Sequence, residues 1–194
     1  MPKGQDSPYE INPSKQPSLN GVKLVEKTIL HERLKFNKVA PEVIGSVLHH
    51  MLFLKNKSSF QDDVKRMNMI NEVGIDVTSF VANTLNFQSY INTTFSILKE
   101  YPEFYMEKFI GNKKATGEAD LVLELQSELV LIDYKSFPGK KEDIFNADSA
   151  FYAGKYSGQL NLYKEMLSDY FVKPVKHQFI YYVVQGVLVE VIQD

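Results

Sequence analysis

The sequence predicts an α/β protein in which a mixed central sheet is flanked by helices, with a helical N-terminal half. Two patterns lead to this prediction. From residue 22 to about residue 98 apolar residues recur mostly at helical spacing, whereas beyond residue 101 short apolar runs suited to strands surround one long helical segment. The composition agrees, because 44% of the 194 residues are hydrophobic and 24% are charged, which is ordinary for a chain that buries one core.

The chain divides into a tail and one domain. Residues 1–20 are rich in Pro, Ser, Asn, Lys and Gln, so we expect a flexible tail or linker, of the kind that connects a domain to the rest of a longer chain. Residues 21–194 are expected to form the domain, with a helical part at 21–100 and a catalytic sheet–helix core at 101–194.

Helix and strand signals follow in order along the domain. Pro41 and Glu42 suit the first turn of a helix that runs through Met51, and Ser58 or Ser59 suits the cap of the next helix. The remaining expected elements are a helix within 77–98, a strand at 103–110, a hairpin of strands at 117–125 and 128–137, a loop at 138–150, a helix at 154–170, and strands at 177–184 and 187–192.

The hairpin carries charged residues inside runs that otherwise suit a core. If Gln126 and Ser127 form a two-residue turn, Asp120 falls opposite Asp133, and Lys135 shares their face of the sheet; a loop with an odd number of residues would break this register. Two opposed carboxylates repel each other unless a positive charge lies between them, and hard divalent cations such as Mg²⁺ bind carboxylate oxygens. The pattern therefore leaves two interpretations open, a surface cluster of charges or a buried site.

Bulk properties exclude several classes of protein. The formal net charge is −2, so a nucleic-acid site would have to be a local basic patch. The chain has no cysteine, which excludes disulfides, thiolate zinc sites and an iron–sulfur cluster, and with no signal peptide this favours the cytoplasm. No apolar run approaches ~18 residues, so no membrane span is expected, and no G-x-x-x-x-G-K-[ST] loop indicates an ATP site in this segment.

Four motifs stand in a fixed order along the chain. They are Gly45-Ser46-Val47-Leu48-His49, Gly117-Glu118-Ala119-Asp120, Ile132-Asp133-Tyr134-Lys135 and Gln159-Leu160-Asn161-Leu162-Tyr163. This order resembles the PD-(D/E)xK nuclease superfamily, in particular the RecB/AddA-type C-terminal nuclease domain of UvrD-like helicase–nucleases. The resemblance spans about residues 41–170 and implies a restriction-endonuclease-like core.

The resemblance also implies roles for individual residues. Asp120, Asp133 and Lys135 would be catalytic, and Mg²⁺ or Mn²⁺ would be held by His49, Asp120, Asp133 and the backbone carbonyl of Tyr134. Gln159 and Tyr163 would contact DNA or orient the site. Some relatives use a further acidic residue on the strand before GxxD, and Glu107 is the candidate here.

Lysines in the loops that flank the hairpin offer a local basic patch. Lys113 and Lys114 precede its first strand, and Lys140 and Lys141 follow its second. Such lysines, together with aromatic residues between 137 and 152, suit the phosphates and bases of single-stranded DNA. A solvated loop with no binding role is the alternative for each lysine.

These observations predict a metal-dependent DNA nuclease, more an exonuclease than an endonuclease. The family implies the nuclease domain of a helicase–nuclease that processes double-strand breaks, with DNA and helicase domains as partners. A stand-alone nuclease is the nearest alternative. A non-catalytic DNA-binding or scaffolding module with a nuclease-like fold is the alternative from a different class. A restriction-type endonuclease would need a separate recognition region, which the sequence does not show.

Overall fold

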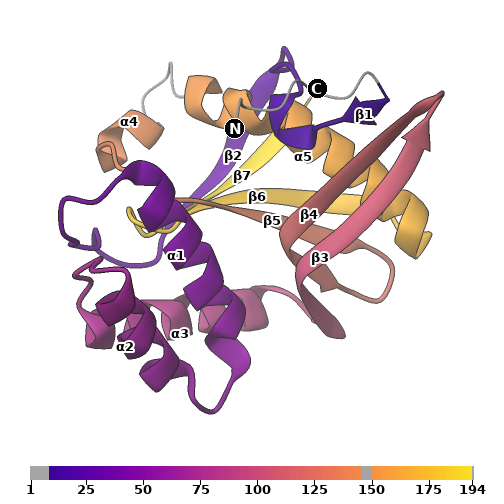
Figure 1. The fold of residues 1–194 in the computed structure, drawn as a ribbon. Coiled ribbons are helices and arrows are strands. Elements are labelled where there is room, and N and C mark those ends of the chain that lie inside the picture. Colours follow the sequence, from indigo (N-terminus) through magenta and orange to yellow (C-terminus); the bar gives the residue numbers. More distant parts are fainter. Residues whose placement is uncertain (1–8, 146–149, 194) are drawn as a thin grey trace.

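A mixed sheet forms the centre of the protein (Figure 1). The computed structural model describes residues 9–145 and 150–193. Within them, seven strands pair in the order β1-β4-β5-β6-β7-β2, with β3 on the other edge of β4. The pairs β1–β4 and β5–β6 are parallel, and the remaining pairs are antiparallel. The strands are β1 (Glu10–Ile11), β2 (Val22–Ile29), β3 (Lys99–Ile110), β4 (Lys113–Glu124), β5 (Leu129–Lys135), β6 (Val175–Tyr182) and β7 (Val187–Gln193).

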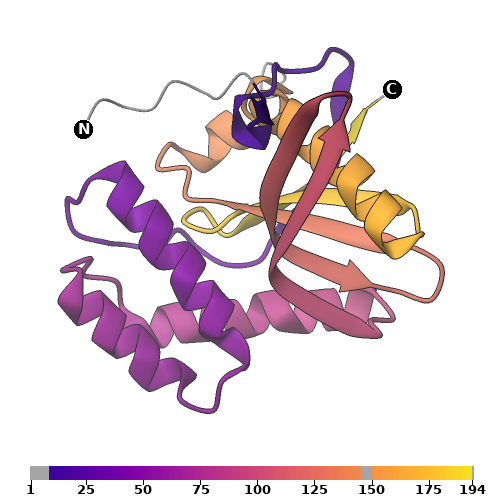
Figure 2. The ribbon, with the colours of Figure 1, turned by 45° about the vertical axis from the view of Figure 1, so that its right-hand side comes forward.

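Helices cover both faces of this sheet. One face carries the first three helices, and the other carries the long helix α5 (Figures 1 and 2). Each layer has its own apolar core, and the two cores share the strands between them. The helices are α1 (Pro41–Phe53), α2 (Phe60–Ile70), α3 (Val77–Thr94), α4 (Lys141–Phe145) and α5 (Ala150–Phe171), with short 3₁₀ turns η1 (Pro13–Lys15) and η2 (Leu54–Asn56).

The predicted α/β class with a mixed sheet is confirmed. The expected helices at 41, 60 and 77 are α1, α2 and α3, and the expected strands at 103–110, 177–184 and 187–192 are β3, β6 and β7 to within a few residues. In the part of the chain that is described, no helix is both long and apolar enough to cross a membrane.

Three expectations about local structure were wrong. Residues 22–29 form β2 rather than a helix, because they pair with β7 at the far end of the chain and close an edge of the sheet. Residues 9–20, expected as flexible tail, contain β1 and η1; Glu10 pairs with Lys114, and Pro13 is buried. The expected loop 138–150 contains α4, while residues 146–149 of it, like 1–8 of the tail, lie outside the described part.

The end of α5 contains a conformationally strained residue. Val172 follows the helix with φ of 53°, a left-handed conformation in which a β-branched side chain is unfavourable and glycine is preferred. Its side chain is 89% exposed, so little packing is lost on truncation. We expect Val172→Gly to raise the free energy of unfolding by about 1 kcal/mol, measured as a higher urea midpoint. Val172→Ala, which keeps a Cβ, is the control, and an equal gain in both variants would contradict the explanation.

Candidate functional site

The hairpin of β4 and β5 has the predicted register. Leu121 pairs with Ile132, and Leu125 N–H donates to the Glu128 carbonyl across the Gln126-Ser127 turn at 3.0 Å. The regular ladder ends at Leu121, one residue before the two aspartates would pair. At this point the side chain of Asp120 takes the place of a backbone acceptor on β4. Its Oδ2 accepts a hydrogen bond from Tyr134 N–H at 2.6 Å. The strands thus separate at the point where Asp120 and Asp133 lie.

A second irregularity lies on the other side of Asp120. The pairing of β3 with β4 omits Glu103 and Asp120, and Glu103 has φ of 45° within a strand. Across this break the buried side chains change layers, because Ala119 belongs to the core beneath α5 and Leu121 to the core of the first three helices. Breaks of this kind turn side chains away from the regular strand directions. Asp120 therefore lies outside the regular pairing of β4 with β3 and with β5.

Asp133 and Lys135 form a buried ion pair. Lys135 Nζ lies 2.6 Å from Asp133 Oδ2, and the two side chains are 19% and 3% exposed. The angle of this contact is not that of a hydrogen bond, and Oδ2 has no other partner within the described residues. Burial raises the pKa of Asp133 to about 6, against the opposing effect of Lys135. Burial lowers the pKa of Lys135, but the negative charge of Asp133, 2.6 Å away, outweighs this effect and raises the pKa overall.

His49 approaches the aspartates from α1. Its Nδ1 lies 2.8 Å from Asp120 Oδ1, and its ring meets the edge of the Tyr134 ring at a centroid distance of 5.9 Å. Burial lowers the pKa of His49, but the hydrogen bond and charge of Asp120 raise it overall. Gly45 lets the helix come this close, because a Cβ there would lie 3.2 Å from Ser136 Oγ. His50 is exposed on the next helical position.

Helix α5 completes the site from the opposite layer. Gln159 Nε2 donates to Asp133 Oδ1 at 3.3 Å, so this side chain orients the aspartate. Lys135 Nζ lies 4.6 Å from the centre of the Tyr156 ring, a cation–π contact that the sequence analysis missed. The signal was present, since residues 156, 159 and 163 share one helical face. Tyr163 packs its ring beneath Gly117.

The contact between Gly117 and Tyr163 leads to a prediction. A Cβ at Gly117 would lie 2.5 Å from Tyr163 Cε1 and 3.1 Å from Pro13 Cγ, so Gly117→Ala requires the ring to move. We expect a loss of about 1–3 kcal/mol in the free energy of unfolding, as for other overpacked cores. Gly154→Ala in α5 is the matched control, because nothing lies within 4 Å of its Cβ position. Chemical denaturation of both variants measures the effect, and equal stabilities would contradict it.

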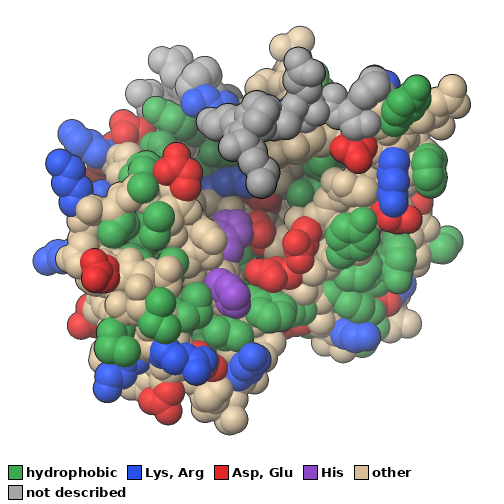
Figure 3. All heavy atoms as spheres, viewed as in Figure 1, with side chains coloured by type: hydrophobic (Ala, Val, Ile, Leu, Met, Phe, Trp, Pro, Cys, Tyr) green, Lys and Arg blue, Asp and Glu red, His purple; other side chains and the backbone are tan. Residues whose placement is uncertain are grey.

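The structure does not bring the predicted further acidic residue to the other site residues. Glu107, the sequence candidate, is bound to Lys114 at 2.6 Å on an exposed part of the hairpin. Glu103 is the acid that faces the site, and with Gly45, Ser46, His49 and His50 it lines an open cleft of about 350 Å³. Burial raises the pKa of Glu103, and the charge of Glu118 raises it further. Figure 3 shows histidine and acidic side chains gathered in this hollow between the helical layer and the β3–β4 hairpin.

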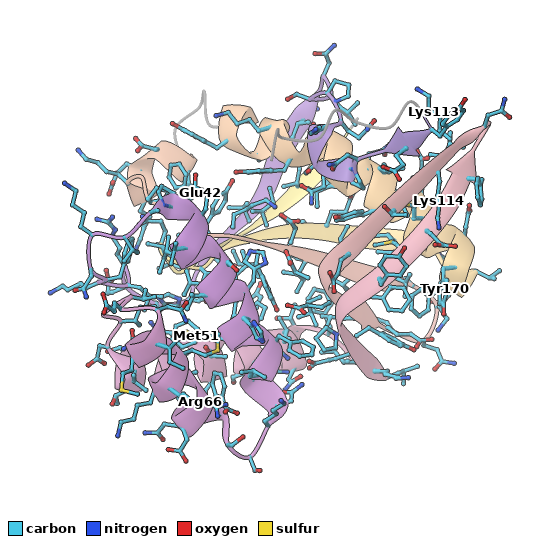
Figure 4. The ribbon with its side chains drawn as sticks, in the orientation of Figure 1. Glu42, Met51, Arg66, Lys113, Lys114 and Tyr170 are labelled. Atoms are coloured by element: carbon cyan, nitrogen blue, oxygen red, sulfur yellow. The ribbon has the colours of Figure 1, made fainter. Side chains whose placement is uncertain are left out.

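The four predicted DNA-binding lysines fall into two groups. Lys113 and Lys114 lie at the outer end of the β3–β4 hairpin (Figure 4), and six residues of strand, about 20 Å, separate Lys114 from Asp120. The structure does not bring these two lysines to the aspartates. Lys140 and Lys141 lie at the start of α4, at the end of the segment that connects Lys135 of β5 to this helix. Lys140 is exposed, and Lys141 Nζ lies 3.9 Å from Glu32 Oε2.

The donor set suits a hard divalent cation. Two carboxylates and one imidazole converge, and Asp133 Oδ2 is buried without a hydrogen bond. Among the described residues, no three His, Asp or Glu side chains stand ready to bind one ion. Asp120 is engaged by His49 and by Tyr134 N–H. Since the N–H and C=O of one strand residue point toward the same neighbour, the Tyr134 carbonyl faces this side as well.

Fold and site together define an α/β protein with a buried Asp–Lys pair and an Asp–His pair at a break in its sheet. No model of a known protein family matches the chain, and no curated protein matches it.

Proposed function

We propose that this protein is a metal-dependent DNA nuclease of the PD-(D/E)xK type, with a restriction-endonuclease-like core. One observation carries the proposal. Asp120, Asp133 and Lys135, which come from two strands, meet His49 of α1 and Gln159 of α5 at the residue where β4 separates from both β3 and β5. A buried cluster of charges at a break in a sheet is costly to the fold, which is typical of functional sites.

Each residue has a role that follows from its contacts. His49, Asp120, Asp133 and the Tyr134 carbonyl would hold Mg²⁺ or Mn²⁺. When bound, the cation would activate a water molecule and neutralise charge on a phosphate. Lys135 supplies a fixed positive charge against the negative charge that develops in phosphodiester hydrolysis. Gln159 and Tyr134 N–H hold the two carboxylates in place, and Tyr156 holds the lysine.

The substrate and the partners rest on the motif resemblance. We propose single-stranded DNA as the substrate, exonucleolytic cleavage, and a helicase in the same chain or complex that delivers the strand. The open cleft beside Glu103 and His50 leaves the site accessible from solvent, as a polymeric substrate requires.

Cleavage assays with defined DNA test the proposal. Labelled single- and double-stranded oligonucleotides and circular single strands are incubated with Mg²⁺, Mn²⁺ or EDTA. We expect metal-dependent cleavage of linear single strands, lost in EDTA and in Asp120→Asn. Cleavage that persists in EDTA would contradict the proposal.

A non-catalytic DNA-binding module is the second candidate. Its support is that Asp120 is already occupied by protein groups and that the described residues contain no preformed ion site. The same assays separate the two functions, because tight DNA binding without cleavage in any metal would favour the module.

A further inference from the structure

The segment that joins β2 to α1 is a loop fixed at several points. Leu34 is buried, and its N–H donates to the Val184 carbonyl at 2.8 Å. Asn37 N–H donates to the Val73 carbonyl at 2.7 Å, and its side-chain amide donates to the Glu72 carbonyl at 3.0 Å. The loop therefore has a defined course across the surface.

This loop presents cations to solvent. Leu34 and Phe36 turn inward, so Arg33, Lys35 and Lys38 are exposed, and we call these three residues the basic loop. Among the described residues, no carboxylate lies within ion-pair distance of the basic loop. Five lysines elsewhere differ in this respect, because Lys55, Lys108, Lys114, Lys135 and Lys173 are each bound to a carboxylate at 2.5–2.7 Å. The charges of the basic loop are thus available to a ligand.

The basic loop lies close to the candidate site. Arg33 Nη2 donates to the Pro138 carbonyl at 2.9 Å, and Pro138 is three residues after Lys135. Three residues span at most about 11 Å of backbone. The Gln185 side chain also binds the Gly139 carbonyl and thereby fixes this connection. Figure 3 shows Lys and Arg side chains along the left edge, where Figure 1 places α4 and the loop before α1.

Two acidic residues near the basic loop accept hydrogen bonds from the protein backbone. Asp76 Oδ1 accepts from Ser79 N–H at 2.6 Å at the start of α3, and Asp143 Oδ2 accepts from Lys140 N–H at 3.0 Å at the start of α4. Glu32, which is exposed, lies 3.9 Å from Lys141. Open clefts of about 360 and 430 Å³ run along Arg33, Leu34 and Lys35, so the surface is hollowed where the cations stand.

We propose that the basic loop binds the phosphate backbone of the DNA strand that is cleaved at Lys135. The inference rests on the proposed function and adds the path of the strand to it. Arg33 and Lys35 are two residues apart in extended chain, about 7 Å, which is close to the separation of successive phosphates in an extended single strand. The strand would leave the site along residues 136–141 and cross the basic loop, with Lys140 and Lys141 beside it.

A salt-dependence measurement tests this path. Fluorescence anisotropy gives the affinity of a labelled 20-nucleotide oligo(dT) for the wild type and for Lys35→Gln/Lys38→Gln, in EDTA so that no cleavage occurs, from 50 to 300 mM NaCl. Arg33 is kept, because it also binds the Pro138 carbonyl. The control is Lys164→Gln/Lys176→Gln, which removes two exposed lysines of α5 and β6. Each phosphate contact contributes about 0.7 to the slope of log K against log [salt], so we expect the slope to fall by about 1.4 in the test variant alone.

The outcomes distinguish this inference from the proposed function. Equal slopes in both variants, or no binding by the wild type at 50 mM NaCl, would overturn the inference. If the wild type cleaves DNA while both variants bind like it, the nuclease proposal survives and the path is wrong. If the slope of log K against log [salt] falls in the test variant while the wild type never cleaves DNA, the basic loop is a DNA-binding surface and the nuclease proposal fails.

Discussion

Replacing Lys135 with methionine is expected to lower the rate of metal-dependent DNA cleavage by about 10²–10³-fold, the usual effect of removing one group that stabilises transition-state charge. Methionine keeps an apolar side chain of similar length but removes the ammonium, which lies over the Tyr156 ring and 2.6 Å from Asp133. DNA affinity should change little, because the side chain is mostly buried. Single-turnover cleavage with saturating enzyme separates the chemical rate from binding.

The same variant should shift the pH dependence of cleavage. Burial raises the pKa of Asp133 to about 6, and Lys135 opposes this rise. Without Lys135 the pKa of Asp133 rises further, so the carboxylate that would bind the cation ionises only at higher pH. The acid limb of the rate–pH profile should therefore shift to higher pH, and part of the lost activity should return in alkaline buffer.

A matched variant separates this effect from a general loss of charge. Lys176→Met removes an exposed lysine of β6 and should leave both the rate and the pH profile unchanged. A Lys135→Met protein that cleaves at the wild-type rate would exclude Lys135 from the chemistry. An unchanged acid limb with a lowered rate would mean that Asp133 does not control the pH dependence.

The hairpin register, which the sequence predicted correctly, depends on local features of the chain. A two-residue turn fixes the register of the hairpin, and alternation then places Asp120 and Asp133 near each other. The spacing of four residues also places Gln159 and Tyr163 on one face of a helix. The sequence pattern does not predict the contacts of the Asp120 side chain with Tyr134 N–H and His49. These contacts form only because β4 and β5 separate at this residue.

The parts that the sequence did not predict depend on long-range contacts. The run Val22-Lys23-Leu24-Val25-Glu26-Lys27-Thr28-Ile29 suits helix or strand, and its pairing with β7, about 160 residues away, decides for strand. Glu103 was missed because a left-handed residue inside a strand has no sequence signal other than glycine or asparagine, and here it is glutamate. Glu107 lies on β3 as predicted, but it pairs with Thr116 rather than lying next to Asp120. Only the register of β3 with β4 shows this.

The second large effect concerns stability, at a buried ion pair away from the site. Lys55 Nζ lies 2.5 Å from Glu100 Oε2, and the side chains are 3% and 16% exposed. Gln88 and Asn56 also donate to this carboxylate. The pair joins η2, after α1, to the start of β3, and so connects the helical layer to the sheet.

Glu100→Leu is expected to lower the free energy of unfolding by about 3 kcal/mol, because it leaves the Lys55 ammonium buried without a partner. For a chain of this size the melting temperature should fall by about 6–12 °C. The double variant Lys55→Met/Glu100→Leu should recover most of the loss, since an apolar pair of similar volume replaces both charges. Arg66→Met, at an exposed pair with Asp63, is the control and should change stability little.

The pH dependence gives an independent check on the same pair. Burial raises the pKa of Glu100, but the hydrogen bond and charge of Lys55 outweigh it and lower this pKa overall. A lowered pKa in the folded state means that the stabilisation is present above the ordinary glutamate pKa and is lost as the pH falls through the folded value. The double variant should therefore lose less stability than the wild type on acidification. Equal acid sensitivity, or a double variant as unstable as Glu100→Leu, would show that the pair does not connect the two layers energetically.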